Sequence, residues 1–232
     1  GLPGVVVSDG RNCAVTDAKG RYELAAMDDS RFVFVSTPSG YLPPVEEGTV
    51  PVFYKEIKGE GTYDFTLGKN PVDDRKHVCL VQSDVQLISE ENLEVYDVLL
   101  DDIMAYRENF KGMDVFGLDC GDIVGDTPSL FAPYTKTASQ LDMPVYRAIG
   151  NHDMDYYGRT FETSYRTFED NFGPACYSFN RGEVHYVVIN NNFYIGRDYF
   201  YIGYVDEKTF RWLEQDLSYV PEGATLIVAM HM

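Results

Sequence analysis

Three clusters of polar side chains each follow a short apolar run of the sequence. The clusters and the runs before them are Ser83-Asp84-Val85-Gln86 after 78–81, Gly121-Asp122 after 115–118, and Gly150-Asn151-His152-Asp153 after 145–149. Continuous apolar runs of this length are typical of parallel strands covered on both faces, and ligands bind outside the carboxyl ends of such strands. If the three strands lie side by side, we expect their polar ends to form one site.

The residue types at these strand ends are those of a divalent metal site. Carboxylate and amide oxygens combined with imidazole suit manganese, iron or zinc, whereas the absence of clustered thiolates argues against structural zinc. Two such ions, held about 3.5 to 4 Å apart, can bind a phosphoryl group and lower the pKa of a bound water. The candidate ligands are Asp84, Gln86, Asp122, Asn151 and His231.

The order of the motifs resembles that of the calcineurin-like metallophosphoesterase superfamily. The motifs are D-x-(H/Q), G-D-x-x-x-D, G-N-H-D and a strand-end His, and together they cover about Lys76 to Met232. The resemblance implies a hydrolase that cleaves a phosphomonoester or phosphodiester by attack of a metal-bound hydroxide. It implies two divalent ions, with Asp84 and Gln86 on the first, Asp122 bridging both, and Asn151 and His231 on the second.

The same resemblance assigns the catalytic residues. It implies that His152 protonates the leaving oxygen or stabilises the transition state, and that Asp153 orients the His152 ring. Individually each motif has an ordinary structural interpretation, because Gly-Asn-His-Asp is also a common turn sequence. Their order, each after an apolar run, favours the metal site.

Two positions depart from the family pattern. Gln86 stands where family members usually carry His, and a neutral amide is a weaker ligand, so we expect a weaker first metal site. The closing G-H-x-H motif of the family does not occur before Met232. We therefore expect a C-terminally truncated chain, and we keep as an alternative a catalytically weak or inactive binding or adhesion module at the cell surface.

The first seventy residues have the pattern of short strands separated by turns, which predicts a small all-β sandwich. The segments 4–10 and 15–24 resemble a carboxypeptidase-regulatory-like module. The polar segment 69–75 is the best linker candidate, so the predicted domains are 1–70 and 76–232. The expected strands are Val5–Val7, Ala14–Thr16, Arg21–Leu24, Phe32–Val35 and Tyr63–Leu67.

In the second domain, apolar residues at helical spacing alternate with apolar strands, which predicts an α/β fold. By resemblance it is a four-layer αββα sandwich, here incomplete. We expect Ser89 to cap the first helix and Asp206 to cap the last. The expected helices and further strands are 89–104, 130–141, 161–172 and 206–217, and 175–180, 183–190 and 226–230, the last of which delivers His231.

Some titratable and aromatic residues have a structural interpretation as well as a functional one. His77 and His185 are expected to pack in the core or at the surface rather than bind metal. Six tyrosines in loops near the predicted site could stack on an aromatic or sugar-bearing leaving group, although packing is the more common role. They are Tyr156, Tyr157, Tyr194, Tyr199, Tyr201 and Tyr204.

Composition narrows the class of partner. The formal charge of −18 over 232 residues disfavours nucleic acid and acidic membranes, so a small phosphoester or phosphoprotein substrate is expected. No apolar run is long enough for a membrane helix. Cys79 and Cys120 are expected in buried strands, and no cysteine pair has C-x-x-C spacing. By resemblance alone, we expect a bacterial protein that is secreted, periplasmic or at the cell surface.

Overall fold

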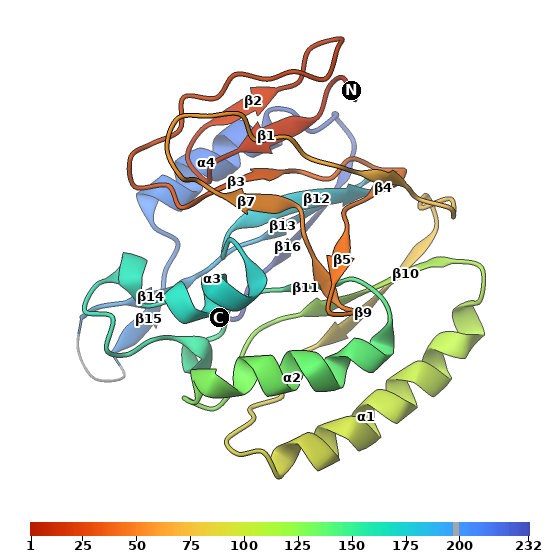
Figure 1. Cartoon of the computed structure of the whole chain (residues 1–232), viewed down its shortest axis with the longest axis vertical. Helices are drawn as coiled ribbons and strands as arrows, with labels where there is room; N and C mark the ends of the chain where they lie inside the picture. Colours follow the sequence, from red (N-terminus) through yellow and green to blue (C-terminus); the bar gives the residue numbers. More distant parts are fainter. Residues whose placement is uncertain (197–199) are drawn as a thin grey trace.

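The computed structural model describes residues 1–196 and 200–232, which form sixteen strands and four α-helices within that part of the chain (Figure 1). The helices are α1 (Asn92–Arg107), α2 (Phe131–Ala138), α3 (Arg166–Phe172) and α4 (Glu207–Leu217). The amino-terminal strands are β1 (Val6–Ser8), β2 (Cys13–Val15), β3 (Phe32–Val35), β4 (Tyr41–Leu42), β5 (Val45–Glu46), β6 (Val50–Pro51), β7 (Tyr54–Glu56) and β8 (Gly68–Lys69). The others are β9 (His77–Gln82), β10 (Asp114–Asp119), β11 (Val145–Arg147), β12 (Tyr177–Arg181), β13 (Val184–Val188), β14 (Asn192–Tyr194), β15 (Tyr201–Gly203) and β16 (Thr225–Ala229). The chain therefore has the mixed α/β composition that the sequence predicts.

The three apolar runs that precede the polar clusters form one parallel sheet in the order β11-β10-β9. Successive side chains of a strand project to opposite faces. On β10, Phe116 and Leu118 belong to one hydrophobic cluster, whereas Val115 packs against another. The sheet is thus covered on both faces, which explains why its strands are apolar without alternation.

The helices α1 and α2 cover one face of this sheet. Leu100 of α1 and Phe131 of α2 are fully buried in the same cluster as Val145 of β11. The predicted cap of α1 is wrong, because the helix begins after Glu91 and Ser89 makes no cap to it. Instead the side chain of Asn92 accepts the backbone N–H groups of Ile88 and Ser89, at 3.1 and 3.2 Å.

A second sheet, β12-β13-β16, lies against the opposite face of the first sheet. It pairs β12 with β13 antiparallel and β13 with β16 parallel, and Phe179 of β12 stacks on Tyr146 of β11 at 3.8 Å between ring centroids. Asp206 caps α4 as predicted, since its Oδ1 accepts the N–H of Thr209 at 2.8 Å. Strand β16 then ends two residues before His231.

One predicted helix is interrupted. The segment 161–172 forms a single 3-10 turn, Phe161–Thr163, and then α3. The hydroxyl of Ser164 donates to the carbonyl of Phe161 at 2.7 Å, and such local side-chain bonds compete with helix continuation. Gly173, with φ 84°, ends α3.

Two predicted strands in the amino-terminal region are wrong. The segments 21–24 and 63–67 have no strand partner, although Tyr22, Leu24, Phe65 and Leu67 all pack against the core. An alternation of apolar and polar residues indicates which side chains are buried. It does not show that a neighbouring strand is present to form backbone hydrogen bonds. The amino-terminal region instead forms the sheet β2-β1-β3-β7, the short hairpin β5-β6, and a separate antiparallel pair, β4-β8.

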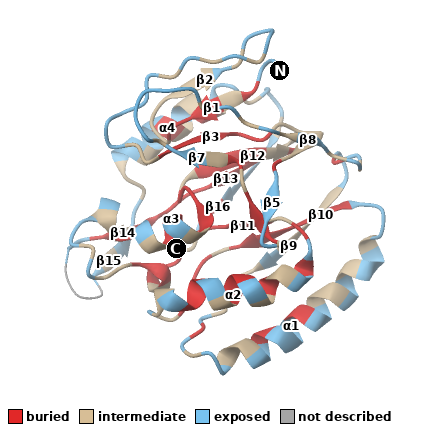
Figure 2. Cartoon of the chain, viewed as in Figure 1, coloured by how far each residue is buried: buried red, intermediate tan, exposed pale blue. Residues whose placement is uncertain are grey.

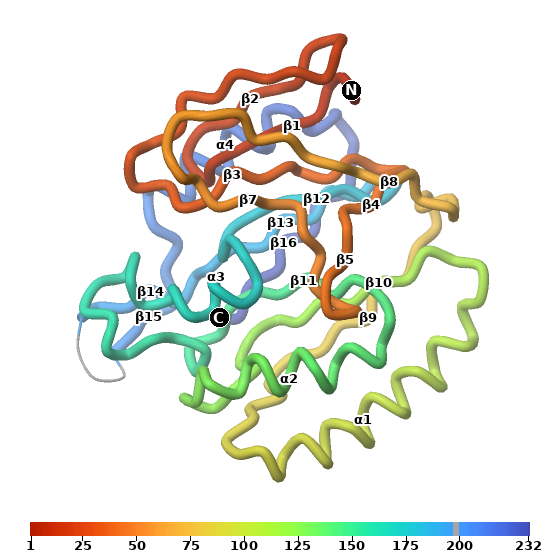
Figure 3. Tube along the Cα trace, in the orientation of Figure 1, coloured from red at the N-terminus to blue at the C-terminus, as the bar shows by residue number. Residues whose placement is uncertain are grey.

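The amino-terminal sheet shares its hydrophobic core with the rest of the chain. Phe53 lies 4.7 Å from Tyr177 between ring centroids, and Phe34 lies 6.2 Å from Trp212 of α4. Figure 2 shows the buried residues continuing from β1 and β3 into β12 and β13. Figure 3 shows α4 beside β1 and β2, and there Gln215 of α4 donates to the carbonyl of Arg11 at 2.8 Å.

The four cysteines are free, and Cys79 and Cys120 are half-buried rather than buried as expected. No helix in the described parts of the chain has both the length and the apolar character needed to cross a membrane.

Candidate metal centre

The loops that follow β9 and β10 hold three of their polar residues in an unusual backbone conformation. Asp84, Gln86 and Asp122 have φ values of 58°, 46° and 55°, a region that non-glycine residues adopt rarely and that is enriched at functional sites. The two loops also bond to each other, because the N–H of Asp84 donates to Gly121 O at 3.0 Å and that of Gln86 to Asp122 O at 2.8 Å. The ends of the two strands are therefore fixed relative to one another.

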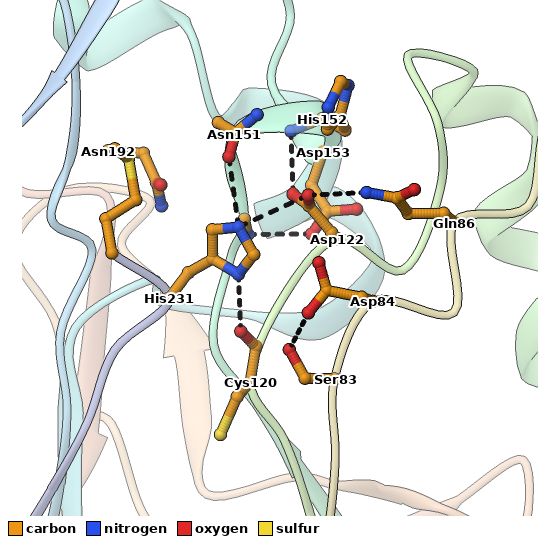
Figure 4. A network of polar contacts seen from close by, with 12 residues as sticks. Ser83, Asp84, Gln86, Cys120, Asp122, Asn151, His152, Asp153, Asn192 and His231 are labelled. Atoms are coloured by element: carbon orange, nitrogen blue, oxygen red, sulfur yellow. Dashed lines mark hydrogen bonds and ion pairs between the residues drawn. The ribbon is translucent and has the colours of Figure 1, made fainter.

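Ligand atoms of Asp84, Asp122 and His231 all lie within 4.8 Å of one another (Figure 4). The Nε2 atom of His231 is 3.3 Å from Asp122 Oδ2 and 3.0 Å from Asn151 Oδ1. The four side chains come from the ends of β9, β10, β11 and β16. The structure thus brings together four of the five predicted ligands, although their role as ligands stays a prediction.

The charge state of His231 follows from these neighbours. Its hydrogen bond with Asp122 raises the pKa of the imidazole from 6.5 to about 9, against the opposing effect of burial. Burial alone would raise the pKa of Asp122, but the bonds from His231 and from the backbone N–H of His152 lower it. The Nδ1 atom of His231 lies 2.9 Å from the Cys120 carbonyl, which leaves Nε2 as the atom directed at the carboxylates.

Gln86 reaches the cluster through its amide nitrogen. Its Nε2 donates to Asp122 Oδ2 at 3.1 Å, while Figure 4 shows its oxygen directed away from that carboxylate. In this arrangement Gln86 is a hydrogen-bond donor to Asp122, and its ligation of a metal stays a prediction.

His152 is paired with a carboxylate that the sequence interpretation did not choose. Its Nδ1 lies 2.9 Å from Asp126 Oδ1, and its backbone N–H donates to Asp122 Oδ1 at 2.9 Å. Both partners of the His152–Asp126 pair are about one third exposed, with side-chain exposures of 36% and 33%. The second Asp of the G-D-x-x-x-D motif was the available signal for Asp126.

The expectation that Asp153 orients the His152 ring is wrong. Asp153 is fully buried, and its two oxygens accept the backbone N–H groups of Val124 at 3.0 Å and Gly150 at 2.8 Å. Burial raises the pKa of this carboxyl well above its ordinary value, despite those two bonds. Asp153 therefore connects the loops after β10 and β11 from within the protein.

Tyrosine side chains surround Asn151. The amide nitrogen of Asn151 lies 3.1 Å from the hydroxyl of Tyr201, and Tyr156 donates to the Asn151 carbonyl at 2.7 Å. Tyr194 donates in turn to the Tyr156 carbonyl, and Tyr157 is almost fully exposed. Tyr199 lies outside the described residues. The contact with Tyr201 directs the amide oxygen of Asn151 towards His231.

The two other histidines predicted to be structural have protein partners. His77 Nε2 lies 2.7 Å from the Tyr186 hydroxyl. His185 is buried, and its Nε2 lies 2.8 Å from Asp216 Oδ2. Neither contacts the metal cluster.

Comparison with known families gives one match. Residues 1–70 match the family described as N terminal of Calcineurin-like phosphoesterase. The match supports the calcineurin-like phosphoesterase superfamily. A search of curated proteins gave no match to the chain. The matched segment ends before β9, so the comparison and the site rest on different parts of the chain.

The superfamily implies divalent metal use, and the donor atoms fit such an ion. Two carboxylates, one amide oxygen and one imidazole nitrogen converge, and this mixture suits a borderline divalent cation. The bond between His231 Nδ1 and the Cys120 carbonyl is the second-layer contact that fixes the tautomer of a metal-binding histidine.

Proposed function

We propose that this protein is a metal-dependent hydrolase of phosphoric esters. The observation that carries the proposal is the convergence of Asp84, Asp122 and His231 within 4.8 Å, with Asn151 Oδ1 beside them. The match of residues 1–70 to a calcineurin-like phosphoesterase family supports it independently. Divalent ions would supply Lewis-acid activation of water and would neutralise the charge of the phosphoryl group. The resemblance implies two such ions, of manganese, iron or zinc.

The residues of the chain then have distinct roles in the proposal. Asp122 lies between the two ligand groups, since its Oδ2 contacts both His231 and Gln86. His152 is proposed to donate a proton to the leaving oxygen from Nε2, because its Nδ1 is held by Asp126. Asp153 fixes the loop that carries His152.

The finer parts of the proposal follow from the resemblance. They are a small phosphomonoester, phosphodiester or phosphoprotein substrate, a four-layer αββα arrangement, and a bacterial protein outside the cytoplasm. The carboxypeptidase-regulatory-like character of residues 1–70 belongs to the same set. The formal charge of −18 supports a small substrate over nucleic acid, because a strongly acidic surface repels a polyanion.

The test compares three forms of the chain: the wild type, His152→Ala and Asp122→Asn. We expect the wild type to bind Mn²⁺ and to hydrolyse bis(p-nitrophenyl) phosphate. His152→Ala should lower turnover by about 10²- to 10⁴-fold and keep the metal, whereas Asp122→Asn should weaken metal binding and turnover together. Absence of divalent metal binding in the wild type, or full turnover by Asp122→Asn, would refute the proposal.

The contact of Gln86 favours a second candidate function, a binding module that holds a phosphorylated ligand without turnover. The amide nitrogen of Gln86 donates a hydrogen bond to Asp122 Oδ2 at 3.1 Å. This bond competes with coordination of a metal by the same oxygen. Gln86→His should then raise metal affinity and turnover. Tight binding of inorganic phosphate, with no turnover by either form, would favour the binding module over the enzyme.

A further inference from the structure

Three polar side chains form a row across the carboxyl ends of the parallel strands. Gln82, Asp119 and Arg147 are the last residues of β9, β10 and β11, and each is paired in register with its neighbour. Register partners project from the same face of a sheet. We call these three residues the strand-end row; it lies on the face that α1 and α2 cover.

Asp119 is the centre of the strand-end row. It is fully buried, and its Oδ2 accepts hydrogen bonds from Gln82 Nε2 at 2.8 Å and from the Tyr134 hydroxyl at 2.7 Å. Gln82 also lies 3.2 Å from the hydroxyl of Tyr96 on α1, whose ring stacks on that of Tyr134 at 5.4 Å. One carboxylate therefore joins the ends of two strands to both covering helices.

The metal-ligand loops begin directly after this row. Asp84 lies two residues beyond Gln82, and Asp122 lies three residues beyond Asp119. Backbone bonds at the same level, from Cys120 N to Gln82 O at 2.8 Å, and from Ala148 N to Asp119 O at 2.7 Å, are the last before the chain leaves the sheet. Segments this short leave little freedom between the row and the ligands.

The two oxygens of Asp119 are not equally satisfied. Asp119 Oδ1 has no hydrogen-bond partner among the described residues, and a buried polar atom without a partner costs about 1–3 kcal/mol. Replacing Asp119 alone by an apolar residue would leave the buried Tyr134 hydroxyl and the Gln82 amide without their acceptor, which is destabilising. A role of Asp119 in placing the loops must therefore be separated from its effect on stability by a measurement at the loops themselves.

We propose that Asp119 is a positioning residue, which through Gln82 and Tyr134 sets the relative placement of the loops that carry Asp84 and Asp122. The inference rests on the proposed function only for what those loops bind. The placement itself is a property of the metal-free chain.

The experiment uses the full chain with Asp119→Leu and Asp119→Asn. It measures the free energy of unfolding in urea, the affinity for Mn²⁺, and the hydrogen exchange of the Asp84 and Gln86 amides without metal. We expect Asp119→Leu to lower stability, because two donors lose their acceptor. It should also weaken Mn²⁺ binding by about 10- to 100-fold and speed exchange of both amides, which the Asp114 control below should not do. Asp119→Asn keeps an acceptor for Gln82, so it should recover most of both properties.

The matched control lies at the other end of the same strand. Asp114, also buried, pairs with the guanidinium of Arg181 at 3.1 Å. Asp114→Asn should lower stability and leave exchange at Asp84 and Mn²⁺ affinity unchanged. If Asp119→Leu does not fold, Gln82→Leu removes the same link and takes its place in each measurement.

Wild-type exchange and affinity in Asp119→Leu would overturn the positioning role. Equal losses in Asp114→Asn would overturn it too, because they would show a general effect of stability. If the wild type binds no Mn²⁺, the proposed function fails, while amide exchange still decides whether Asp119 positions the loops.

Discussion

Gly150→Ala should weaken metal binding by displacing one candidate ligand. A Cβ at Gly150 would lie 2.1 Å from both the backbone N and the Oδ1 of Asp122. Gly150 has φ −100° and ψ 175°, an extended conformation that alanine adopts freely, so the substitution introduces only a steric clash. Relief to an acceptable contact requires a shift of about 1 Å between the two loops, and overpacking of this kind costs about 1–3 kcal/mol.

A shift of this size exceeds the tolerance of a metal site, where ligand distances vary by about 0.2 Å. We therefore expect Mn²⁺ affinity, measured by calorimetry, to fall by at least about tenfold, and turnover of a chromogenic phosphodiester by about 10²-fold. The matched control is Gly125→Ala, whose Cβ would lie 2.5 Å from the Cγ2 methyl of the exposed Ile88 and at an ordinary contact distance of 3.7 Å from the Gln86 carbonyl oxygen. That side chain can rotate away, so the control should bind Mn²⁺ like the wild type.

Wild-type Mn²⁺ affinity in folded Gly150→Ala would refute the reasoning, because the site would then not depend on the close approach of the loops after β10 and β11.

Three further predictions concern pH, ligand orientation and helix capping. Burial raises the pKa of Glu169 from 4.5 to about 7 despite its bond with Arg31 at 3.1 Å, so its stabilising contribution is full below about pH 4.5 and is lost as the pH rises through about 7. Urea titrations should show that Glu169→Gln lacks this loss of about 3 kcal/mol; parallel curves for the two proteins would contradict it. Tyr201→Phe frees the amide nitrogen of Asn151 and should weaken metal binding by about 10-fold with little change in melting temperature; unchanged affinity would show that Tyr201 does not orient the ligand. Asp206→Ala removes the cap of α4 and should cost about 1 kcal/mol of unfolding free energy, with Asp206→Asn close to wild type; an unaltered urea midpoint in Asp206→Ala would argue against the cap.

The strands that carry the site were predictable because buried parallel strands are almost entirely apolar. The runs at 78–81 and 115–118 lie within β9 and β10. The polar residues that follow them lie close together at the carboxyl edge of the sheet. The convergence of Asp84, Asp122 and His231 follows from that topology.

The partner of His152 was not predictable in the same way. Asp153 is next in the sequence, yet in the 3-10 turn 151–153 its side chain bends back to the N–H of Gly150. Asp126 reaches the ring from a loop where it has φ 61°. The spacing of residues in the sequence does not specify the direction of a side chain within a single turn. It also does not show which residue will adopt a left-handed backbone conformation.

The strand-end row was also missed, since Gln82 and Asp119 directly follow the apolar runs and belong to none of the motifs. Only the register between β9 and β10 shows that they are neighbours.

The aromatic contacts of Phe34 and Phe53 have a practical consequence for anyone who shortens this chain. A version that starts at Lys76 would leave Tyr177 and Trp212 without the rings that lie 4.7 and 6.2 Å from them. The apolar surface that this exposes to solvent would favour aggregation. Expression trials should therefore retain the first strands.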